Sequence, residues 1–151
     1  MDIRIDDVTG AQTLELIRLH LGQMHVHSPA GSVFALGVEG LKSRDVTVWT
    51  AWEKDSICGI GALRQFDSVS GEVKAMRTHP NWLRQGVGRK ILDQIIGEAR
   101  RRKLLRLSLE TGSGEAFEPA IALYRNNGFV AGAPFADYKA TGFNQFLHLD
   151  L

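Results

Sequence analysis

The sequence predicts an α/β protein built on a single mixed sheet with about four helices. Strand patterns joined by short turns over residues 46–78 favour antiparallel pairing, and a strand, helix, strand succession over residues 71–111 favours a parallel pair. With 151 residues, 44% of them hydrophobic, the chain has the size and apolar content of one globular domain. We therefore expect residues 1–151 to form a single domain.

The first 41 residues begin with a clear pattern and then lose it. Residues 3–8 alternate apolar and polar side chains and predict a strand. Thr9 is a residue type that caps helices, and a helix is expected over residues 11–21. The segment GQMHVHSPAGS at 22–32 is irregular, and a short helix is expected over residues 33–41.

The next three segments predict the antiparallel part of the sheet. Residues 46–52 and 57–66 are rich in β-branched and aromatic side chains and are separated by the turn-like EKDS. A third strand is expected over residues 71–78, after the turn DSVSG. Short turns between consecutive strands favour an antiparallel meander.

A long amphipathic helix is expected over residues 87–103, followed by a strand over 104–110. The apolar residues of this helix recur on one face with the 3.6-residue period: Val87, Ile91, Leu92, Ile95, Ile96 and Ala99. Because a helical crossover joins parallel strands, strand 71–78 is expected to pair in parallel with strand 104–110.

The last part of the chain adds one helix and two strands. The helix is expected over residues 117–126, with Pro119 in its first turn and Gly128 suited to a left-handed C-terminal cap. Strands are expected from Phe129 onward and over residues 145–149.

Composition and charge argue against several classes of function. Lys and Arg number 18 against 17 Asp and Glu, so the net charge is +1, and we expect neither a nucleic-acid nor a membrane partner. The basic run 100–103 is interpreted as a solvated helix end.

The single Cys58 allows no internal disulfide and is expected in the core. We expect a cytoplasmic protein, and a homodimer is left open.

Residues 84–90 contain a pattern typical of phosphate binding. Gly86 and Gly88 open the long helix, so unobstructed backbone N–H groups converge at its N-terminus, and Arg84, Arg89 and Lys90 add positive charge there. The Lys-Ser/Thr pair of a Walker loop and the third glycine of a dinucleotide fingerprint are both missing. A pyrophosphate cradle remains, with a flexible turn carrying surface arginines as the alternative.

Together with its neighbours, this loop resembles the GNAT N-acetyltransferases. MRTHP at 76–80 with RQGVG at 84–88 is similar to the family's coenzyme A motif, and ALY at 122–124 followed by NGF at 127–129 is similar to its LYxxxGF motif. LSLETGS at 107–113 and PFADY at 134–138 resemble a bacterial subgroup without a settled substrate. The resemblance covers nearly the whole chain and implies the GNAT fold.

The resemblance also implies which residues bind acetyl-CoA. The backbone of Met76, Arg77 and Thr78 would pair with the pantetheine arm. The loop amides at the pyrophosphate would be those of Arg84, Gln85, Gly86, Val87, Gly88 and Arg89. The strands on either side of the long helix would splay apart to admit the thioester.

Two positions depart from the family pattern. Leu83 stands where the family has Gln or Arg three residues before the first motif glycine, so the usual side-chain contact to the phosphate is not expected. Phe117 stands near the place of the Asn that is often found before the fourth helix, which removes a cofactor contact from that region.

Acetyl transfer to an amine requires one group to take a proton and another to give one. Tyr124 matches the tyrosine that often serves the family as general acid, and packing against the sheet is its alternative role. Glu72 is a candidate general base at the strand leading into the site. Glu110 competes for that role, or binds a cationic acceptor.

The acceptor pocket is expected to include the segment HVHSP. His25 and His27 alternate as on an extended segment, and without nearby carboxylates or cysteines they do not predict a metal site. The resulting hypothesis is transfer of an acetyl group from acetyl-CoA to a small amine or amino-acid-like acceptor by direct attack in a ternary complex. The alternative is a non-catalytic module that binds or senses acyl-CoA.

Overall fold

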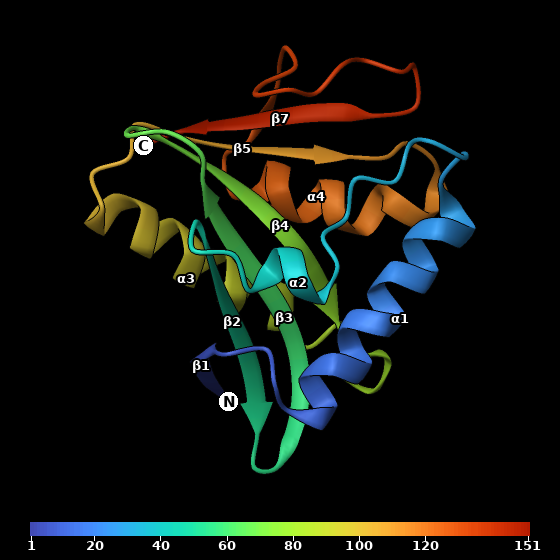
Figure 1. The fold of residues 1–151 in the computed structure, drawn as a ribbon, viewed down its shortest axis with the longest axis vertical. Helices are drawn as coiled ribbons and strands as arrows, with labels where there is room; N and C mark the ends of the chain where they lie inside the picture. Colours follow the sequence, from blue (N-terminus) through green and yellow to red (C-terminus); the bar gives the residue numbers. More distant parts are fainter.

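One seven-stranded sheet organises the computed structural model, which describes residues 1–151 (Figure 1). The strand order is β1-β2-β3-β4-β5-β7-β6, and only β4 and β5 pair in parallel. The elements are β1 (Asp2–Asp6), α1 (Ala11–His27), α2 (Val38–Leu41), β2 (Val46–Glu53), β3 (Ser56–Gln65), β4 (Ser70–Thr78), the 3₁₀ turn η1 (Pro80–Trp82), α3 (Val87–Arg101), β5 (Arg106–Thr111), the 3₁₀ turn η2 (Glu115–Phe117), α4 (Glu118–Asn126), β6 (Val130–Ala131) and β7 (Gln145–Asp150). The predicted mixed sheet with four helices is confirmed.

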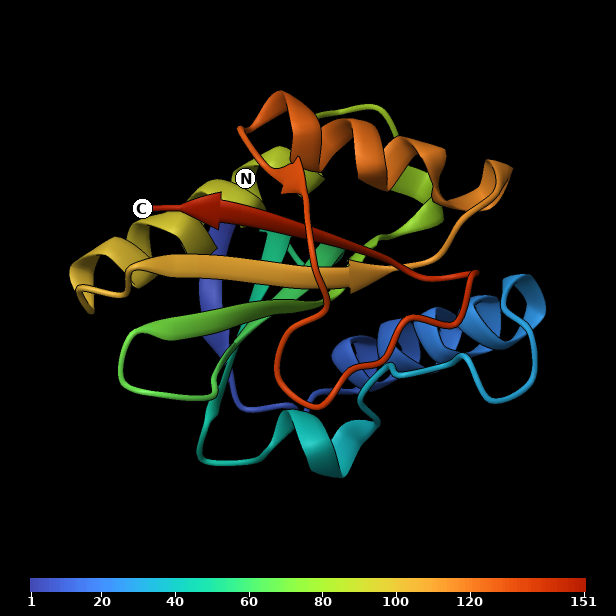
Figure 2. The same cartoon turned by 90° about the horizontal axis from the view of Figure 1, so that it is seen from above.

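Helices cover both faces of the sheet. Figure 2 shows α3 and α4 on one face and α1 and α2 on the other. The α3 side holds a cluster of 17 buried apolar residues, and the α1 side holds a smaller cluster of eight. All six apolar positions predicted for α3 are buried, so the 3.6-residue period identified the face that packs on the sheet.

The sheet opens between its two parallel strands. β4 and β5 pair only over Ser70–Glu72 and Arg106–Ser108, although both strands continue beyond this stretch. The pairing of β4 with β3 also changes register near Ala75, whose φ of 57° marks a bulge. As Figure 1 shows, the two strands then diverge, as predicted. One edge of β4 therefore has no strand partner after Glu72.

The end of α4 is capped as the sequence predicts. Gly128 has a φ of 95°, and its N–H donates to the Arg125 carbonyl while the N–H of Phe129 donates to the Tyr124 carbonyl. These two bonds form a Schellman motif, which satisfies carbonyls at the helix end. Pro119 lies in the first turn of α4. The cap therefore fixes the C-terminal turn of the helix that carries Tyr124.

The first helix corrects two expectations. It runs to His27 rather than ending near residue 21, so residues 22–27 are helical and not irregular. The helix ends before Pro29, because the residue preceding a proline disfavours helical geometry. The N-cap is Gly10, while the Thr9 hydroxyl donates to Asp7 instead.

Other boundaries shift by smaller amounts. The expected helix over 33–41 is confined to Val38–Leu41, because residues 33–37 are irregular. β1 ends at Asp6, since Val8 adopts a left-handed φ of 62° that a strand does not allow. No helix is both long and apolar enough to cross a membrane.

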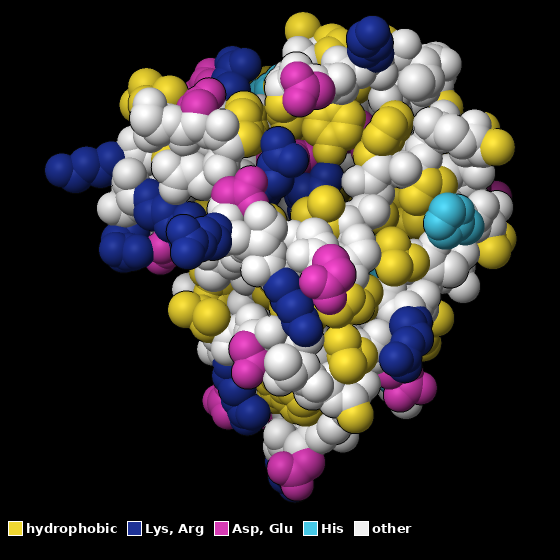
Figure 3. Space-filling view, viewed as in Figure 1, with side chains coloured by type: hydrophobic (Ala, Val, Ile, Leu, Met, Phe, Trp, Pro, Cys, Tyr) yellow, Lys and Arg dark blue, Asp and Glu magenta, His cyan; other side chains and the backbone are white.

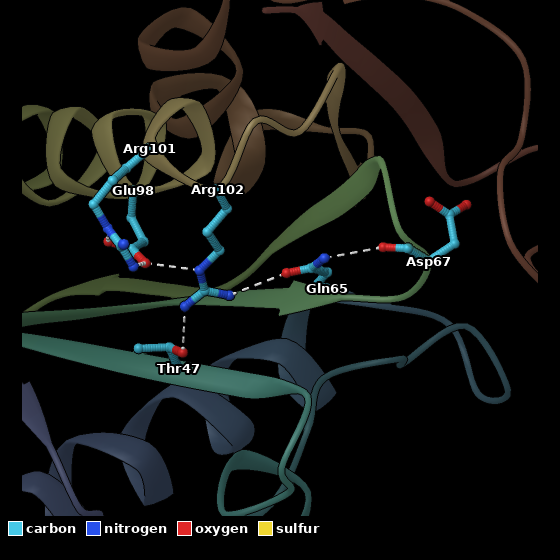
Figure 4. A network of polar contacts seen from close by, with 6 residues as sticks. All are labelled: Thr47, Gln65, Asp67, Glu98, Arg101 and Arg102. Atoms are coloured by element: carbon cyan, nitrogen blue, oxygen red, sulfur yellow. Dashed lines mark hydrogen bonds and ion pairs between the residues drawn. The ribbon is translucent and has the colours of Figure 1, made fainter.

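The basic end of α3 is not simply a solvated helix end. Figure 4 shows Arg102 reaching from the helix to the sheet: its Nε lies 2.7 Å from Glu98, and its Nη2 donates to the Thr47 hydroxyl at 2.9 Å. Its Nη1 also lies 3.4 Å from Gln65 Oε1. Arg101 fits the solvated interpretation, with 72% of its side chain exposed, whereas Arg102 is only 24% exposed and links α3 to β2 and β3.

Neutralising Glu98 should weaken this link in a pH-dependent way. Hydrogen bonds from Arg101 and Arg102 lower the pKa of Glu98 from 4.5 to about 2. Because the folded pKa lies below the unfolded one, the carboxylate stabilises the fold above about pH 4.5 and loses this contribution as the pH falls towards 2. We expect Glu98→Gln to lower the free energy of unfolding by about 1 kcal/mol at neutral pH, allowing for solvent screening.

Urea unfolding of both proteins at neutral pH and at about pH 3 measures this difference. Glu15→Gln, an exposed position of α1 without an ion pair, is the matched control and should change little at either pH. A stability difference for Glu98→Gln that persists undiminished at acidic pH would contradict the lowered pKa.

Candidate active site

A cavity of about 420 Å³ occupies the gap between β4 and β5. We call it the central cavity. Its lining includes residues of α1, β4, β5 and α4, among them His20, Glu72, Lys74, Arg77, Glu110 and Tyr124, and it includes Phe34 from the segment between α1 and α2. A second, more open pocket meets it at Phe34 and Lys74. In this region Figure 3 shows Lys and Arg side chains in a hollow between α2 and the loop before β7, next to hydrophobic ones.

The loop before α3 has the backbone needed to bind an anion. Gly86 is the N-cap of α3 with a φ of 78°, and a Cβ placed there would meet no atom within 4 Å, so the space beside Gly86 at the start of the helix is open. Arg84, Gln85 and Arg89 are exposed around this space, whereas Val87 is buried and anchors the loop to the core. The conformation fits the expected pyrophosphate cradle.

The predicted pantetheine strand lies between this loop and the central cavity. Met76 and Arg77 line the cavity. Thr78 lies at the other end, with its Oγ1 3.8 Å from the position a Cβ would take on Gly88. The exposed edge of β4 therefore leads from the start of α3 to the cavity, as a ligand with a phosphate end and a thioester end requires.

Tyr124 is both a packing residue and a cavity residue. Its side chain is 6% exposed, and its ring packs against Phe129 at 5.8 Å between centroids. Its hydroxyl has no hydrogen-bond partner within the chain, and the residue lines the central cavity. Burial raises the pKa of Tyr124 well above that of an ordinary phenol, although the charge of Arg77 partly offsets the shift. The hydroxyl thus stays protonated at neutral pH and can donate.

Glu72 is a buried carboxylate near the start of β4. Its Oε2 accepts a 2.5 Å hydrogen bond from the Tyr138 hydroxyl and a 3.2 Å one from Lys74. Its Oε1 lies 3.5 Å from Arg64 Nε without forming a hydrogen bond. Burial, followed by the negative charge of Glu72, raises the pKa of Tyr138. Glu72 is thus the centre of a charged cluster that links β4 to the loop before β7.

Of the other three predicted pocket residues, two line the central cavity and one does not. Glu110 lines the central cavity, and burial raises its pKa. His27 also lines the cavity, from the last turn of α1. His25 is exposed and is not among the lining residues. The two histidines are helical, so the expectation of an extended segment is wrong.

Sequence reasoning missed several polar residues of the site. His20 is buried, and its Nδ1 accepts a 3.0 Å hydrogen bond from Arg77 Nε. Burial, followed by the charges of Arg77 and Lys74, lowers the pKa of His20 to about 3, so its ring is neutral. The sequence does indicate that His20 is buried, because it follows Leu16 and Ile17 at helical spacing on the same face of α1. Tyr138 was part of the motif PFADY but was given no role.

No group of three or more His, Cys, Asp or Glu side chains is arranged to hold a metal ion. Cys58 is buried in the core, as expected, and burial raises the pKa of its thiol. His79 caps η1, with its Nδ1 accepting from the Asn81 N–H at 3.1 Å. These residues have structural roles.

Comparison with known proteins agrees with this geometry. The acetyltransferase (GNAT) domain family matches residues 44–131. The chain is 49% identical over 138 residues to the uncharacterized N-acetyltransferase YsnE of Bacillus subtilis, with 91% of each chain covered. It is 43% identical over 149 residues to the uncharacterized N-acetyltransferase YedL of Escherichia coli, covering 99% of this chain and 94% of that one.

Solved structures show the same architecture. A putative acyl-CoA N-acyltransferase from Klebsiella pneumoniae superposes with a TM-score of 0.80 at 25% identity, covering 99% of this chain and 97% of that one. A GNAT family acetyltransferase from Elizabethkingia anophelis with acetyl-CoA bound has the same fold, with a TM-score of 0.69 at 16% identity and coverage of 99% and 97%.

The opened sheet with a glycine-capped helix beside it is the scaffold of an acyltransferase. The chain belongs to the GNAT acetyltransferase family.

Proposed function

We propose that this enzyme transfers an acetyl group from acetyl-CoA to a small amine or amino-acid-like acceptor by direct attack in a ternary complex. The observation that carries the proposal is the central cavity, which opens where β4 and β5 diverge and is reached along the free edge of β4 from the N-terminus of α3. This arrangement lets one face of the molecule hold the phosphates, the pantetheine arm and the thioester in sequence.

The residues present fit acetyl-CoA. The loop amides of residues 84–89 would hold the pyrophosphate, and the backbone of residues 76–78 would pair with the pantetheine arm. When bound, acetyl-CoA supplies the acetyl group as a reactive thioester. Leu83 is 58% exposed and brings no charge to this loop, so the phosphate contacts would come chiefly from the backbone.

Two proton transfers are assigned to residues of the chain. A carboxylate takes a proton from the acceptor ammonium, the neutral nitrogen forms the new C–N bond as the C–S bond breaks, and the Tyr124 hydroxyl gives its proton to the departing thiolate. The phenolate then recovers the second amine proton, and the carboxylate returns its proton to water. The positive charge of Arg77 stabilises the phenolate in the meantime.

Two carboxylates compete for the role of general base. Glu72 lines the cavity but already binds Lys74 and Tyr138 through Oε2. Glu110 has no ion-pair partner, and burial raises its pKa above the ordinary value of a carboxyl group, which makes it a stronger base than an exposed glutamate. These observations favour Glu110, and Glu72 remains the second candidate.

Acetyl-CoA should raise the melting temperature of the protein, because a ligand that binds only the folded state stabilises it. At about 100 times its dissociation constant the stabilisation would be about 2.7 kcal/mol, which shifts the melting temperature by several degrees. ATP and NAD, with phosphates but no pantetheine, are the controls and should shift it less. A larger shift with ATP or NAD would contradict the assignment. Binding without thiol release from any amine would favour the sensing module instead.

A further inference from the structure

Two charged side chains line the central cavity without an ion-pair partner. Arg77 makes one side-chain hydrogen bond, from its Nε to the Nδ1 of His20, and takes part in no salt bridge. Glu110 lies on the facing strand β5 and also forms no salt bridge. Both charged groups are partly withdrawn from water, and holding a charge there without an oppositely charged partner costs free energy.

Arg77 keeps its positive charge in this setting. His20 is neutral at physiological pH, because burial and the nearby charges of Arg77 and Lys74 lower its pKa to about 3. It therefore accepts a hydrogen bond from Arg77 without neutralising it, and this bond fixes the orientation of the guanidinium. Burial lowers the pKa of Arg77, but an arginine stays protonated at neutral pH.

Lys74, the other cation of the cavity, is already engaged. Its three N–H donors have three acceptors: the Phe34 carbonyl at 3.3 Å, Glu72 Oε2 at 3.2 Å and the Tyr138 hydroxyl at 2.7 Å. Arg77 by contrast has further N–H donors beyond Nε, in the planar arrangement that binds a carboxylate with two parallel hydrogen bonds. Arg77 is thus the cation available to a ligand.

We infer that the acceptor is a zwitterion, an amino acid whose carboxylate is bound by Arg77 and whose ammonium group is bound by Glu110. This inference rests on the proposed function and makes its acceptor more specific. A simple amine would satisfy Glu110 but leave Arg77 without a counter-charge. An amino acid satisfies both and adds no net charge to the cavity.

The substrate test compares compounds that differ only in the carboxylate. Thiol release from acetyl-CoA is measured with the protein amino acids, each beside its α-amide and its decarboxylated amine. We expect kcat/KM for the preferred amino acid to exceed that of either analogue by about tenfold or more, because a charge-assisted bidentate contact is lost. The amino group of the α-amide is less basic and more often neutral, so the supply of neutral amine alone would favour the amide over the amino acid.

The variant test separates carboxylate recognition from structure. We expect Arg77→Met to lower kcat/KM for the amino acid about 10-fold to 100-fold relative to kcat/KM for its decarboxylated amine, because only the amino acid loses the carboxylate contact. Loss of the charge beside Tyr124 slows both acceptors alike and cancels in this ratio. Arg77→Lys should restore part of the loss, since the charge returns without the bidentate geometry. Arg18→Met, at an exposed position of α1, is the matched control.

Other results of these two tests would contradict either the carboxylate site or the transferase function. If amides or decarboxylated amines are used as well as amino acids, or if Arg77→Met slows all acceptors equally, the carboxylate site is wrong while the transferase function stands. If no compound releases thiol, the catalytic part of the proposed function fails, and calorimetry with amino acids in the presence of coenzyme A decides the inference. Binding that requires Arg77 supports it, and no binding refutes it.

Discussion

Replacing Tyr124 with phenylalanine should lower kcat about 100-fold or more, the range in which a positioned general acid contributes. The substitution removes only the hydroxyl, which has no hydrogen-bond partner in the chain, and keeps the ring that packs on Phe129. KM for acetyl-CoA and the melting temperature should therefore change little. Steady-state kinetics with thiol detection, together with thermal unfolding, measure both effects.

The dependence of kcat on pH independently tests the role of Tyr124 as general acid. Because burial raises the pKa of Tyr124, the phenol should stay protonated throughout the range in which the acceptor amine loses its proton. We expect kcat to rise with pH and to show no alkaline decline below about pH 10, the ordinary pKa of a phenol. An early decline would indicate a different acid.

A matched control separates chemistry from packing at this position. Phe129→Leu alters the ring that touches Tyr124 but leaves the hydroxyl in place. It should lower stability by about 1 kcal/mol while kcat is retained. If Phe129→Leu and Tyr124→Phe reduce kcat equally, or if Tyr124→Phe has full activity, the hydroxyl is not the acid.

The fold was predictable where one physical signal dominated. The apolar face of α3 follows the helical period without interruption, so both its packing and the parallel pairing of its flanking strands could be predicted. In α1 the pattern is less clear, because the segment from residue 22 onward looks irregular in sequence although residues 22–27 are helical. Gly22 lies on the exposed side, where glycine costs about 1 kcal/mol relative to alanine. Burial of Leu16, Ile17 and His20 stabilises the same helix.

The site was predictable where it depends on backbone conformation and less so where it depends on side chains distant in sequence. Gly86 carries its own signal, since a left-handed residue before a helix favours glycine. The contact between Glu72 and Tyr138 spans 66 positions and depends on a loop before β7 without regular structure. No periodic pattern in that loop indicates which of its residues faces the cavity, so only the folded chain reveals the cluster.

Replacing Gly86 with glutamate should reduce acetyl-CoA affinity by about two to three orders of magnitude. A carboxylate about 4 Å from a phosphate near a protein surface costs about 4 kcal/mol, and the position faces open space where the pyrophosphate would lie. An L-residue at the φ of 78° adds about 1–2 kcal/mol of strain to the loop. The core of the fold should remain, because Gly86 is exposed.

Gly97→Glu supplies the matched control, because it introduces the same charge at an exposed position of the same helix, where a Cβ also meets no atom within 4 Å. It should leave acetyl-CoA binding intact and slightly stabilise α3, since glycine is a poor helix former. Calorimetric titration of both variants then separates local charge at the helix N-terminus from added charge in general. Equal loss in both would point to a long-range effect, and unchanged affinity in Gly86→Glu would place the pyrophosphate elsewhere on the surface.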